Sequence, residues 1–349
     1  MKISLLTIWH DGNYGAEMQA YATIKILKQL GHDVEMIDIR LSDKNHLSLR
    51  GRIGYYISIL SPYYRKFNSF WRKHIPTTRR FRTLKELQDN PPIADAYVVG
   101  SDQVWNPTLT KDFRNLYFLD FGDDDVKRIS YASSFGTDKW NHDNCTEEIR
   151  RLLERFSAIS SREISGVEIL KEIFNVHAVN VLDPTLLFNG YPELTGKLEE
   201  TKNLVYYPLS SFPELEKYSN ELANRLGLNS YNVNWHKNLS KGVTWNRNSI
   251  ENWVKDIAEA KFVITPSFHG LAFSLIYHRQ FAIIVKNKSL ATRITSLLRL
   301  LELEDRVYES IEELDNAEPW NNKIDYEKVD KILSTLREKS ISFLKEALN

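Results

Sequence analysis

The segment Ser267-Phe268-His269-Gly270 contains residue types that bind anions and move protons, and it joins two apolar runs. The run that ends at Thr265 predicts a buried strand, and the run that begins at Gly270 predicts a helix. The first backbone N–H groups of a helix attract anions, and a histidine beside them can donate a hydrogen bond or transfer a proton near neutral pH. The segment is therefore either an anion site or a helix cap followed by a packed histidine.

Three other polar loops that contain glycine follow runs with the pattern of strands, at 12–15, 100–102 and 133–136. Glycine there lets the backbone approach a ligand closely, although one such loop alone indicates only a tight turn. The carboxyl ends of parallel strands lie at the same edge of a sheet, where α/β proteins bind ligands. Together with the loop around His269, these loops favour a binding edge.

Two charged residues at strand ends are candidates for chemistry. Asp102 follows the predicted strand 96–99 and is either a base toward a sugar hydroxyl or a cap of the next turn. Arg162 follows the predicted strand 158–161. Its fork of donors either binds phosphate or carboxylate or pairs with Glu163 or another acid.

Other charged residues follow strands further along the chain. Lys286 ends a predicted strand, and Arg293 lies near the start of the helix predicted after it. Each is either a solvated charge or a cation of the same site as His269. Asp183 precedes Pro184 and is interpreted as a residue that begins a turn.

The chain has 349 residues, which is long enough for two domains with a core each. Its 46 basic and 46 acidic residues balance, so the net charge indicates no class of partner. Cys145 is the only cysteine, which excludes an internal disulfide and fits a reducing compartment. The first residues show no signal-peptide pattern, and no apolar run reaches roughly 18 residues, so we expect a cytoplasmic protein.

The spacings of common metal and cofactor motifs are absent. The chain has no cysteine or histidine pair at metal-ligand spacing, no dinucleotide glycine fingerprint, no Walker A loop and no GxSxG elbow. We therefore expect neither a bound metal nor a cofactor.

Residues 50–82 contain nine arginine or lysine residues, eight aromatic residues and no acid. The segment is either an aromatic insertion packed on the first domain, with its charges in solvent, or an amphipathic surface for anionic lipid or a lipid-linked glycan. Single-stranded nucleic acid is a third, weaker interpretation. Because no nucleic-acid module is recognisable, we expect no such partner.

Predicted strands and helices alternate along the chain, which indicates parallel sheets covered by helices. The polar, turn-rich stretch 188–201 separates two such blocks and is interpreted as a linker. We expect an α/β fold of two Rossmann-like domains facing across a cleft, at 1–190, with the basic aromatic insertion at 45–90, and at 200–325. The amphipathic helix predicted at 326–349 is expected to pack back on the N-terminal domain.

This ordered set of loops resembles the polysaccharide pyruvyl transferase family. Each piece is weak by itself, but the set runs in the family's order and the pattern covers most of the chain. The matching pieces are NYGA at 13–16 with QAYA at 19–22, GSDQVWN at 100–106, SYASSFG at 130–136, SRE at 161–163, VLDPT at 181–185, and SFHG at 267–270 with FSLI at 273–276.

The resemblance implies a fold like that of GT-B glycosyltransferases. It implies transfer of a pyruvyl group from phosphoenolpyruvate to a sugar of a capsular, exopolysaccharide or cell-wall glycan precursor, commonly as a cyclic ketal. His269 is then expected to bind the donor phosphate or act as acid or base, and Asp102 to orient or deprotonate the acceptor. The C-terminal domain is expected to be the donor side, and the residues expected to bind the donor are Arg162, from the N-terminal domain, and Ser267, Phe268, Gly270, Lys286 and Arg293. The residues expected at the acceptor, which is free or lipid-linked, are Asn13, Tyr14, Gly15, Trp105 and Ser134.

Two positions depart from the family's pattern. Distant members carry Arg-Leu-His where this chain has the segment from Ser267 to His269, so the second cation must come from elsewhere. Glu163 stands where many members carry aspartate, which keeps the charge. Two other functions stay open: a nucleotide-sugar glycosyltransferase of the same architecture, and a non-catalytic glycan-binding subunit, which the missing arginine favours.

Overall fold

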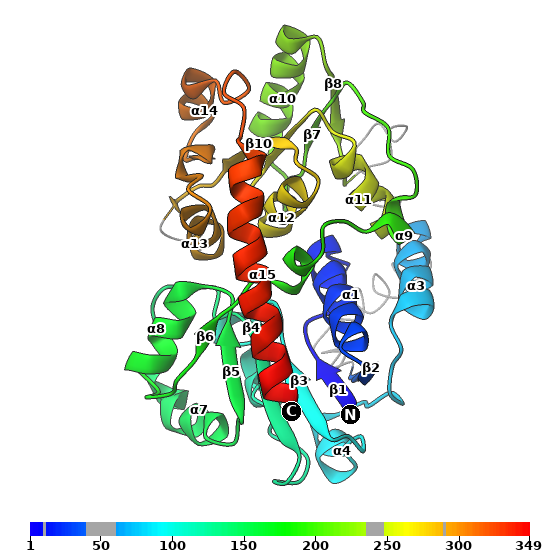
Figure 1. Cartoon of the computed structure of the whole chain (residues 1–349), viewed down its shortest axis with the longest axis vertical. Helices are drawn as coiled ribbons and strands as arrows, with labels where there is room; N and C mark the ends of the chain where they lie inside the picture. The colour runs from blue at the N-terminus through cyan, green and yellow to red at the C-terminus, as the bar shows by residue number, and fades with distance from the viewer. Residues whose placement is uncertain (10–11, 40–60, 235–247, 289–290) are drawn as a thin grey trace, which may run out of the picture. The chain divides into compact units, whose positions relative to one another are not determined.

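The computed structural model describes residues 1–9, 12–39, 61–234, 248–288 and 291–349. They fall into two compact units. Unit 1 comprises Met1–Tyr56, Ser69–Leu187 and Thr335–Asn349, and unit 2 comprises Ile57–Asn68 and Phe188–Ser334. Each unit is built on a parallel sheet with helices packed on it (Figure 1).

The sheet of unit 1 has the strand order β2-β1-β3-β4-β5-β6, and its pairs are parallel. Every residue of β3 is buried, as expected for an inner strand of a parallel sheet, whose sequence is apolar throughout rather than alternating. The strands are β1 Lys2–Leu6, β2 Asp33–Met36, β3 Ala96–Val99, β4 Lys127–Ser133, β5 Ala158–Ser161 and β6 Val179–Asn180.

The sheet of unit 2 has the order β11-β10-β9-β7-β8, again with parallel pairs. Its inner strand β9 is likewise buried at every residue. The strands are β7 Asn203–Tyr206, β8 Asn229–Asn232, β9 Phe262–Thr265, β10 Gln280–Ile284 and β11 Val307–Tyr308.

Both sheets have a topological switch point at their first strand. In unit 1, β1 lies between β2 and β3, and in unit 2, β7 lies between β8 and β9. The chain therefore continues on one side of β1 with β2 and on its other side with β3, and in the same way on the two sides of β7 with β8 and β9. Doubly wound sheets bind ligands outside the carboxyl ends of the strands at such a point. The loop after β3 contains Asp102, and the loop after β9 leads to His269.

The helices of the two units connect these strands. The end of α15 belongs to unit 1, where Ser340 Oγ accepts a hydrogen bond from Leu182 N over 3.0 Å. The helices are α1 Tyr14–Gln29, α3 Pro62–His74, α4 Leu84–Asp89, α5 Pro107–Thr110, α6 Arg114–Tyr117, α7 Thr146–Leu153, α8 Ile164–Glu172, α9 Pro192–Thr195, α10 Pro213–Leu226, α11 Ile250–Ala258, α12 Phe268–Ile276, α13 Thr292–Leu300, α14 Ile311–Ala317 and α15 Tyr326–Leu348.

The α/β fold with two parallel sheets confirms the predicted fold class. The sequence also predicts a strand over 177–182, but only Val179–Asn180 pair with β5. The strand β11 was not predicted, since two residues carry no periodic pattern. The strands predicted at 96–99 and 158–161 begin and end where the structure has them, and the run that ends at Thr265 forms β9. The helix predicted at 326–349 is present as Tyr326–Leu348.

Candidate functional site

The amino end of helix α12 is tied to the sheet of unit 2 by a chain of side-chain hydrogen bonds. Ser267 is the N-cap, and its Oγ accepts from Gly270 N over 3.2 Å. Thr265, the last residue of β9, accepts from Ser267 N through Oγ1 over 3.0 Å and donates to the carbonyl of Tyr207 over 2.8 Å. The cap therefore holds the start of α12 against the carboxyl ends of β7 and β9.

His269 is the second residue of α12 and keeps 6% of its surface exposed. The helix is buried along its whole length, so its position is set by apolar packing rather than by the histidine. The ring of Phe268 packs edge-on against the imidazole, with 5.4 Å between the centroids. The positive end of a helix dipole at a switch point, with a histidine in its first turn, is an arrangement that suits an anion.

Gly270 brings α12 close to β9. A Cβ at this position would lie 2.7 Å from Thr265 Oγ1 and 2.8 Å from Thr265 Cγ2. We expect Gly270→Ala to lower the free energy of unfolding by about 1–3 kcal/mol, because the buried site has no room for a methyl group. Urea denaturation measures this loss. Adding Thr265→Ser, which removes Cγ2, should restore part of it; an unchanged stability of Gly270→Ala would contradict the close approach.

Lys286 and Arg293 lie at the same edge of this sheet as His269. Strand β10 pairs with β9 in parallel, with Ile283 opposite Thr265. Lys286 follows the end of β10 and is exposed, and Arg293 lies half-buried in the first turn of α13. The structure therefore keeps both as candidates for a second positive charge at this edge.

In unit 1, the guanidinium of Arg162 lies among three carboxylates, with none of its side chain exposed. Its NH1 donates to Asp183 Oδ2 over 2.8 Å and its NH2 to Asp102 Oδ1 over 3.0 Å. The Nε is 3.9 Å from Glu163 Oε2. Burial alone would lower the pKa of Arg162, but the neighbouring carboxylates of Asp102 and Asp183 outweigh it and raise the pKa.

Two members of this cluster bind other parts of the same sheet edge. Glu163 Oε1 accepts from the backbone N–H groups of Phe135 and Gly136 over 2.9 and 3.3 Å. Asp183 Oδ1 accepts from the backbone and hydroxyl of Thr185 over 3.0 and 2.7 Å. Its Oδ2 also accepts from Ser101 Oγ over 2.9 Å. The cluster thus joins the loops that follow β3, β4 and β5.

Asp102 lies at the carboxyl end of β3, beside the switch point of unit 1. Its side chain is 15% exposed, whereas those of Arg162 and Asp183 are fully buried. Its φ of 68° lies in the left-handed region, which is uncommon outside glycine and is tolerated best by Asn and Asp. Ser134 N donates to its carbonyl over 3.0 Å, and Gln103 N donates to its Oδ1 over 2.9 Å.

The residues predicted at the acceptor have different degrees of burial. Asn13 is exposed and caps α1 by accepting from Gly15 N. Trp105 has no exposed surface and donates from Nε1 to the carbonyl of Tyr117 over 3.0 Å. Tyr14, Gly15 and Ser134 are buried as well. Of the five, only Asn13 is exposed, and the contacts predicted for all five stay predictions.

The sequence interpretation of Asp183 was incomplete, and that of Ser101 was missing. Asp183 does begin a turn, through Thr185, but its other oxygen binds Arg162 and Ser101. A polar residue directly after a strand was the available signal for both. The sequence gives no indication that strands β3 and β6 bring them to the same guanidinium.

The basic aromatic segment 50–82 is described only from residue 61 onward. Within unit 1, Phe70 and Trp71 of α3 are buried. Trp71 Nε1 donates to the carboxylate of Glu17, itself fully buried, over 2.5 Å. Phe70 packs against Tyr21 with 5.6 Å between ring centroids. Phe70 and Trp71 therefore pack on the first domain, as one of the two leading interpretations predicted, whereas the described residues of the segment up to Asn68 belong to unit 2.

Trp71→Phe tests what this packing contributes. We expect the free energy of unfolding to fall by about 1–3 kcal/mol, because the buried carboxylate of Glu17 loses a donor while the aromatic packing is largely kept. Urea denaturation followed by circular dichroism measures it, with Arg72→Ala on the exposed face of α3 as the control. If Trp71→Phe left stability unchanged but weakened binding to anionic vesicles, the lipid interpretation would be favoured instead.

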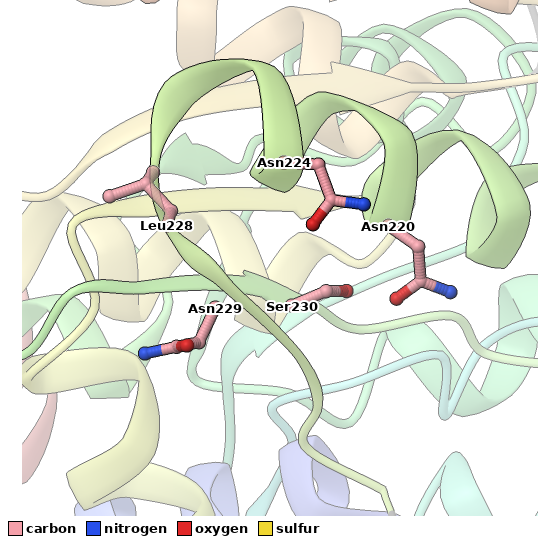
Figure 2. Close-up of a pocket in the computed structure, with 5 residues that line it drawn as sticks. All are labelled: Asn220, Asn224, Leu228, Asn229 and Ser230. Carbon is pink, nitrogen blue, oxygen red and sulfur yellow. The ribbon is translucent and has the colours of Figure 1, made fainter.

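Two hollows in the structure lie away from these sheet edges. One, of about 590 Å³, is lined by residues from the end of α10 and the start of β8, namely Asn220, Asn224, Leu228, Asn229 and Ser230 (Figure 2). The other, of about 640 Å³, lies at the end of α7 and before β4, lined by Asp120, Asp124, Arg151, Leu152, Glu154 and Arg155. Both lie near the amino ends of the parallel strands, opposite the edges with Asp102 and His269.

Two classes of feature are not found in the described part of the chain. No group of three or more His, Cys, Asp or Glu side chains there is arranged to hold a metal ion. No helix of that part is both long and apolar enough to cross a membrane.

Comparison with solved structures finds the fold of GT-B glycosyltransferases. UGT89C1 of Arabidopsis thaliana matches with a TM-score of 0.51 and 11% identity, over 97% of this chain and 94% of that chain. The UDP-GlcNAc 2-epimerase of Methanocaldococcus jannaschii, in complex with UDP-GlcNAc and UDP, matches with a TM-score of 0.52 and 11% identity, over 96% of this chain and 99% of that chain. Identities this low establish the fold alone.

Comparison with curated protein sequences gives no significant match. A family profile does match. The profile described as polysaccharide pyruvyl transferase aligns with residues 13–287, which is most of the chain and includes the loops that hold Asp102, Arg162 and His269. The chain therefore belongs to the polysaccharide pyruvyl transferase family.

Proposed function

We propose that this protein transfers a pyruvyl group from phosphoenolpyruvate to a sugar of a capsular, exopolysaccharide or cell-wall glycan precursor, forming a pyruvate ketal and releasing phosphate. The observation that carries the proposal is the position of His269. It lies in the first turn of α12, at the switch point of a doubly wound sheet, in a chain of this family. Such an edge provides both anion binding and a proton donor.

Phosphoenolpyruvate carries a phosphate and a carboxylate, so its site needs helix N–H groups and at least one cation. In the proposal, the first N–H groups of α12 and His269 bind one anionic group. The hydroxyl of Ser267 accepts a hydrogen bond as N-cap and brings no charge. Lys286 and Arg293, which follow the neighbouring strand β10, bring the positive charge for the other group.

The reaction needs one proton on carbon and two sugar hydroxyls. Protonation of the methylene carbon of phosphoenolpyruvate creates an oxocarbenium-like centre at the adjacent carbon, which one acceptor hydroxyl attacks. The bond between that carbon and the phosphate oxygen then breaks, and the second hydroxyl closes the ketal. The two sugar hydroxyls release two protons. These balance the proton added to the methylene carbon and the proton that the released phosphate takes up. His269 is proposed to provide the first proton or to bind the leaving phosphate.

The acceptor is proposed to bind at the sheet edge of unit 1. Asp102 there is partly exposed at the end of β3, and Asn13 is exposed at the start of α1. The oxygens of a carboxylate and of a carboxamide accept hydrogen bonds from hydroxyl groups, so both side chains can bind a neutral sugar. No metal or cofactor is part of the proposal.

Incubation of the purified protein with phosphoenolpyruvate and a panel of galactosides, mannosides and hexosaminides, free and lipid-linked, tests the proposal. We expect release of inorganic phosphate and the mass gain of a pyruvyl ketal on one acceptor class. Release of a nucleoside diphosphate from a nucleotide sugar, with no use of phosphoenolpyruvate, would favour a glycosyltransferase. Binding of a glycan without any turnover would favour a non-catalytic subunit.

We place this reaction in the cytoplasm, because a single cysteine without a disulfide fits a reducing compartment. Contact with an anionic membrane surface through residues 50–82 is a further part of the proposal when the acceptor is lipid-linked. Cosedimentation with vesicles that contain anionic lipid, compared with neutral vesicles, measures that contact.

A further inference from the structure

The cluster around Arg162 has one buried end and one end that solvent reaches. At the buried end, Asp183 receives hydrogen bonds from Thr185, Ser101 and Arg162, and its side chain is fully buried. At the other end, Asp102 receives a hydrogen bond from the same guanidinium, and its side chain is 15% exposed. Arg162 therefore connects a rigid anchor to a carboxylate that a ligand can touch.

Arg162 itself offers no surface to a ligand. None of its side chain is exposed, and two of its nitrogens donate to carboxylates over 2.8 and 3.0 Å. To bind the phosphate or carboxylate of a donor, the guanidinium would have to leave Asp102 and Asp183 and uncover two buried charges. Leaving a buried carboxylate without its cation is strongly unfavourable, so the geometry argues against a direct contact.

We propose that Arg162 is a positioning residue for Asp102 and not a ligand of the donor. Held in this way, Asp102 stays ionised and accepts a hydrogen bond from a hydroxyl of the acceptor sugar. The inference rests on the proposed pyruvyl transfer, and it changes the expected role of Arg162 from donor binding to acceptor recognition.

The hydrogen bonds that hold Asp102, called the clamp below, also fix its backbone. Its left-handed φ of 68° is a backbone conformation that residues other than glycine rarely adopt unless their surroundings hold them there. The hydrogen bonds from Gln103 N and Arg162 NH2 both reach Oδ1, and Ser134 N holds the carbonyl. An acceptor hydroxyl must be placed within a fraction of an ångström for the transfer. A carboxylate held by two hydrogen bonds, on a backbone held by a third, can place it.

Pairing with Arg162 also bears on what Asp102 does chemically. The carboxylate of Asp102 is one of the charges that raise the pKa of Arg162, and such coupling is reciprocal, so it favours the ionised form of Asp102. A carboxylate stabilised in this way is a weak base. Orientation of the hydroxyl is therefore the role that the cluster supports, rather than removal of its proton.

A double-mutant cycle with Arg162→Lys and Asp102→Asn tests the inference. Lysine keeps the charge but loses the fork that reaches Asp183 and Asp102 together. We expect each single variant to lower kcat/KM for the acceptor found in the panel by about 10- to 100-fold. The double variant should be no worse than Asp102→Asn alone, because Arg162 acts through Asp102. If the fold-loss in kcat/KM of the double variant equalled the product of the two single losses, the inference would be overturned.

The affinity for phosphoenolpyruvate distinguishes an Arg162 that positions Asp102 from an Arg162 that binds the donor. Titration calorimetry with phosphoenolpyruvate should give the same Kd for Arg162→Lys as for the wild type, within about twofold. A donor-binding arginine would instead weaken the Kd by about tenfold or more. Arg151→Lys, an exposed arginine of the same unit, is the control for the substitution itself.

A third measurement does not depend on turnover, so it distinguishes failure of the inference from failure of the proposed function. Aspartate labelled with ¹³C at the carboxyl gives a resonance for Asp102 that disappears in Asp102→Asn. We expect this carboxyl to stay ionised to lower pH in the wild type than in Arg162→Gln. If the Asp102 carboxyl ionised over the same pH range in both proteins, the positioning role of Arg162 would be contradicted, even if pyruvyl transfer were established. The expected difference would support the clamp, even if no acceptor were turned over.

Discussion

Replacing His269 with asparagine is expected to lower the rate of phosphate release from phosphoenolpyruvate by about 10²–10⁴-fold, the usual contribution of a positioned acid or base. The imidazole lies in the first turn of α12, where the helix N–H groups favour an anion. Asparagine keeps a hydrogen-bond donor there but cannot transfer a proton near neutral pH. The loss should fall mainly on kcat if His269 is the acid, and on the KM for phosphoenolpyruvate if it binds phosphate.

His278 provides a matched control for this variant. It belongs to the same unit and is half exposed, and its Nε2 lies 3.1 Å from Asp330 Oδ1, within hydrogen-bond distance, on the surface. Its φ of 55° is left-handed, a conformation that asparagine tolerates well, so His278→Asn should fold normally. We expect it to keep wild-type activity. Activity of His269→Asn close to that of His278→Asn would remove His269 from the mechanism.

Arg162→Met is expected to lower the free energy of unfolding at neutral pH by about 3–5 kcal/mol, the loss found when one partner of a buried ion pair is removed. Methionine fills a similar length of side chain but leaves the carboxylates of Asp102, Asp183 and Glu163 without this cation. Urea denaturation at neutral pH measures the loss. Arg151→Met, at an exposed position of unit 1, should change stability by less than about 0.5 kcal/mol.

The pH dependence of this loss has a definite sign. The pKa of Arg162 is raised in the folded protein, chiefly by Asp102 and Asp183 against the effect of burial. The titration of Arg162 itself therefore leaves this contribution in place at neutral pH, and the contribution is lost only as pH rises through the folded pKa of Arg162, in strongly alkaline solution. In Arg162→Met the buried carboxylates lose a cation, which raises their pKa values in the folded protein. The loss in free energy of unfolding is therefore present at neutral pH, and it becomes smaller as these carboxylates take up protons.

The measurement is therefore repeated at about pH 5, above the ordinary pKa values of aspartate and glutamate. We expect a smaller difference between Arg162→Met and the wild type there than at neutral pH. A difference that grew on acidification would mean that Arg162 does not stabilise these carboxylates in the folded state.

Much of the fold follows from local patterns in the sequence. Runs such as 96–99 and 262–265 predicted inner strands because a parallel sheet buries both faces, and their bounds agree with the structure. The serine at 267 was also recognisable as a helix cap, since a side-chain oxygen that accepts from the third N–H of a helix is a local interaction. Short elements without a period, such as β11, gave no such signal.

The partners of charged side chains were not predictable in the same way. Arg162 binds Asp102, which is 60 positions away, and Asp183, which is 21 positions away. Its pairing with an acid was one of two open interpretations, and only the strand order decides which acids lie beside β5. Trp105 shows the same limit, because the burial of its indole against Phe118 depends on packing that no local pattern predicts.

By itself, the sequence determined the two parallel sheets, the family and the strand ends that form each candidate site, because apolar periodicity, caps and glycine loops act over a few residues. The tertiary structure alone decided which of the polar groups at those strand ends remain accessible. Burial of Arg162 and Trp105 and exposure of Asp102 and Lys286 follow from how strands distant in the chain pair and pack. Burial depends on contacts between distant segments, and no local pattern encodes them.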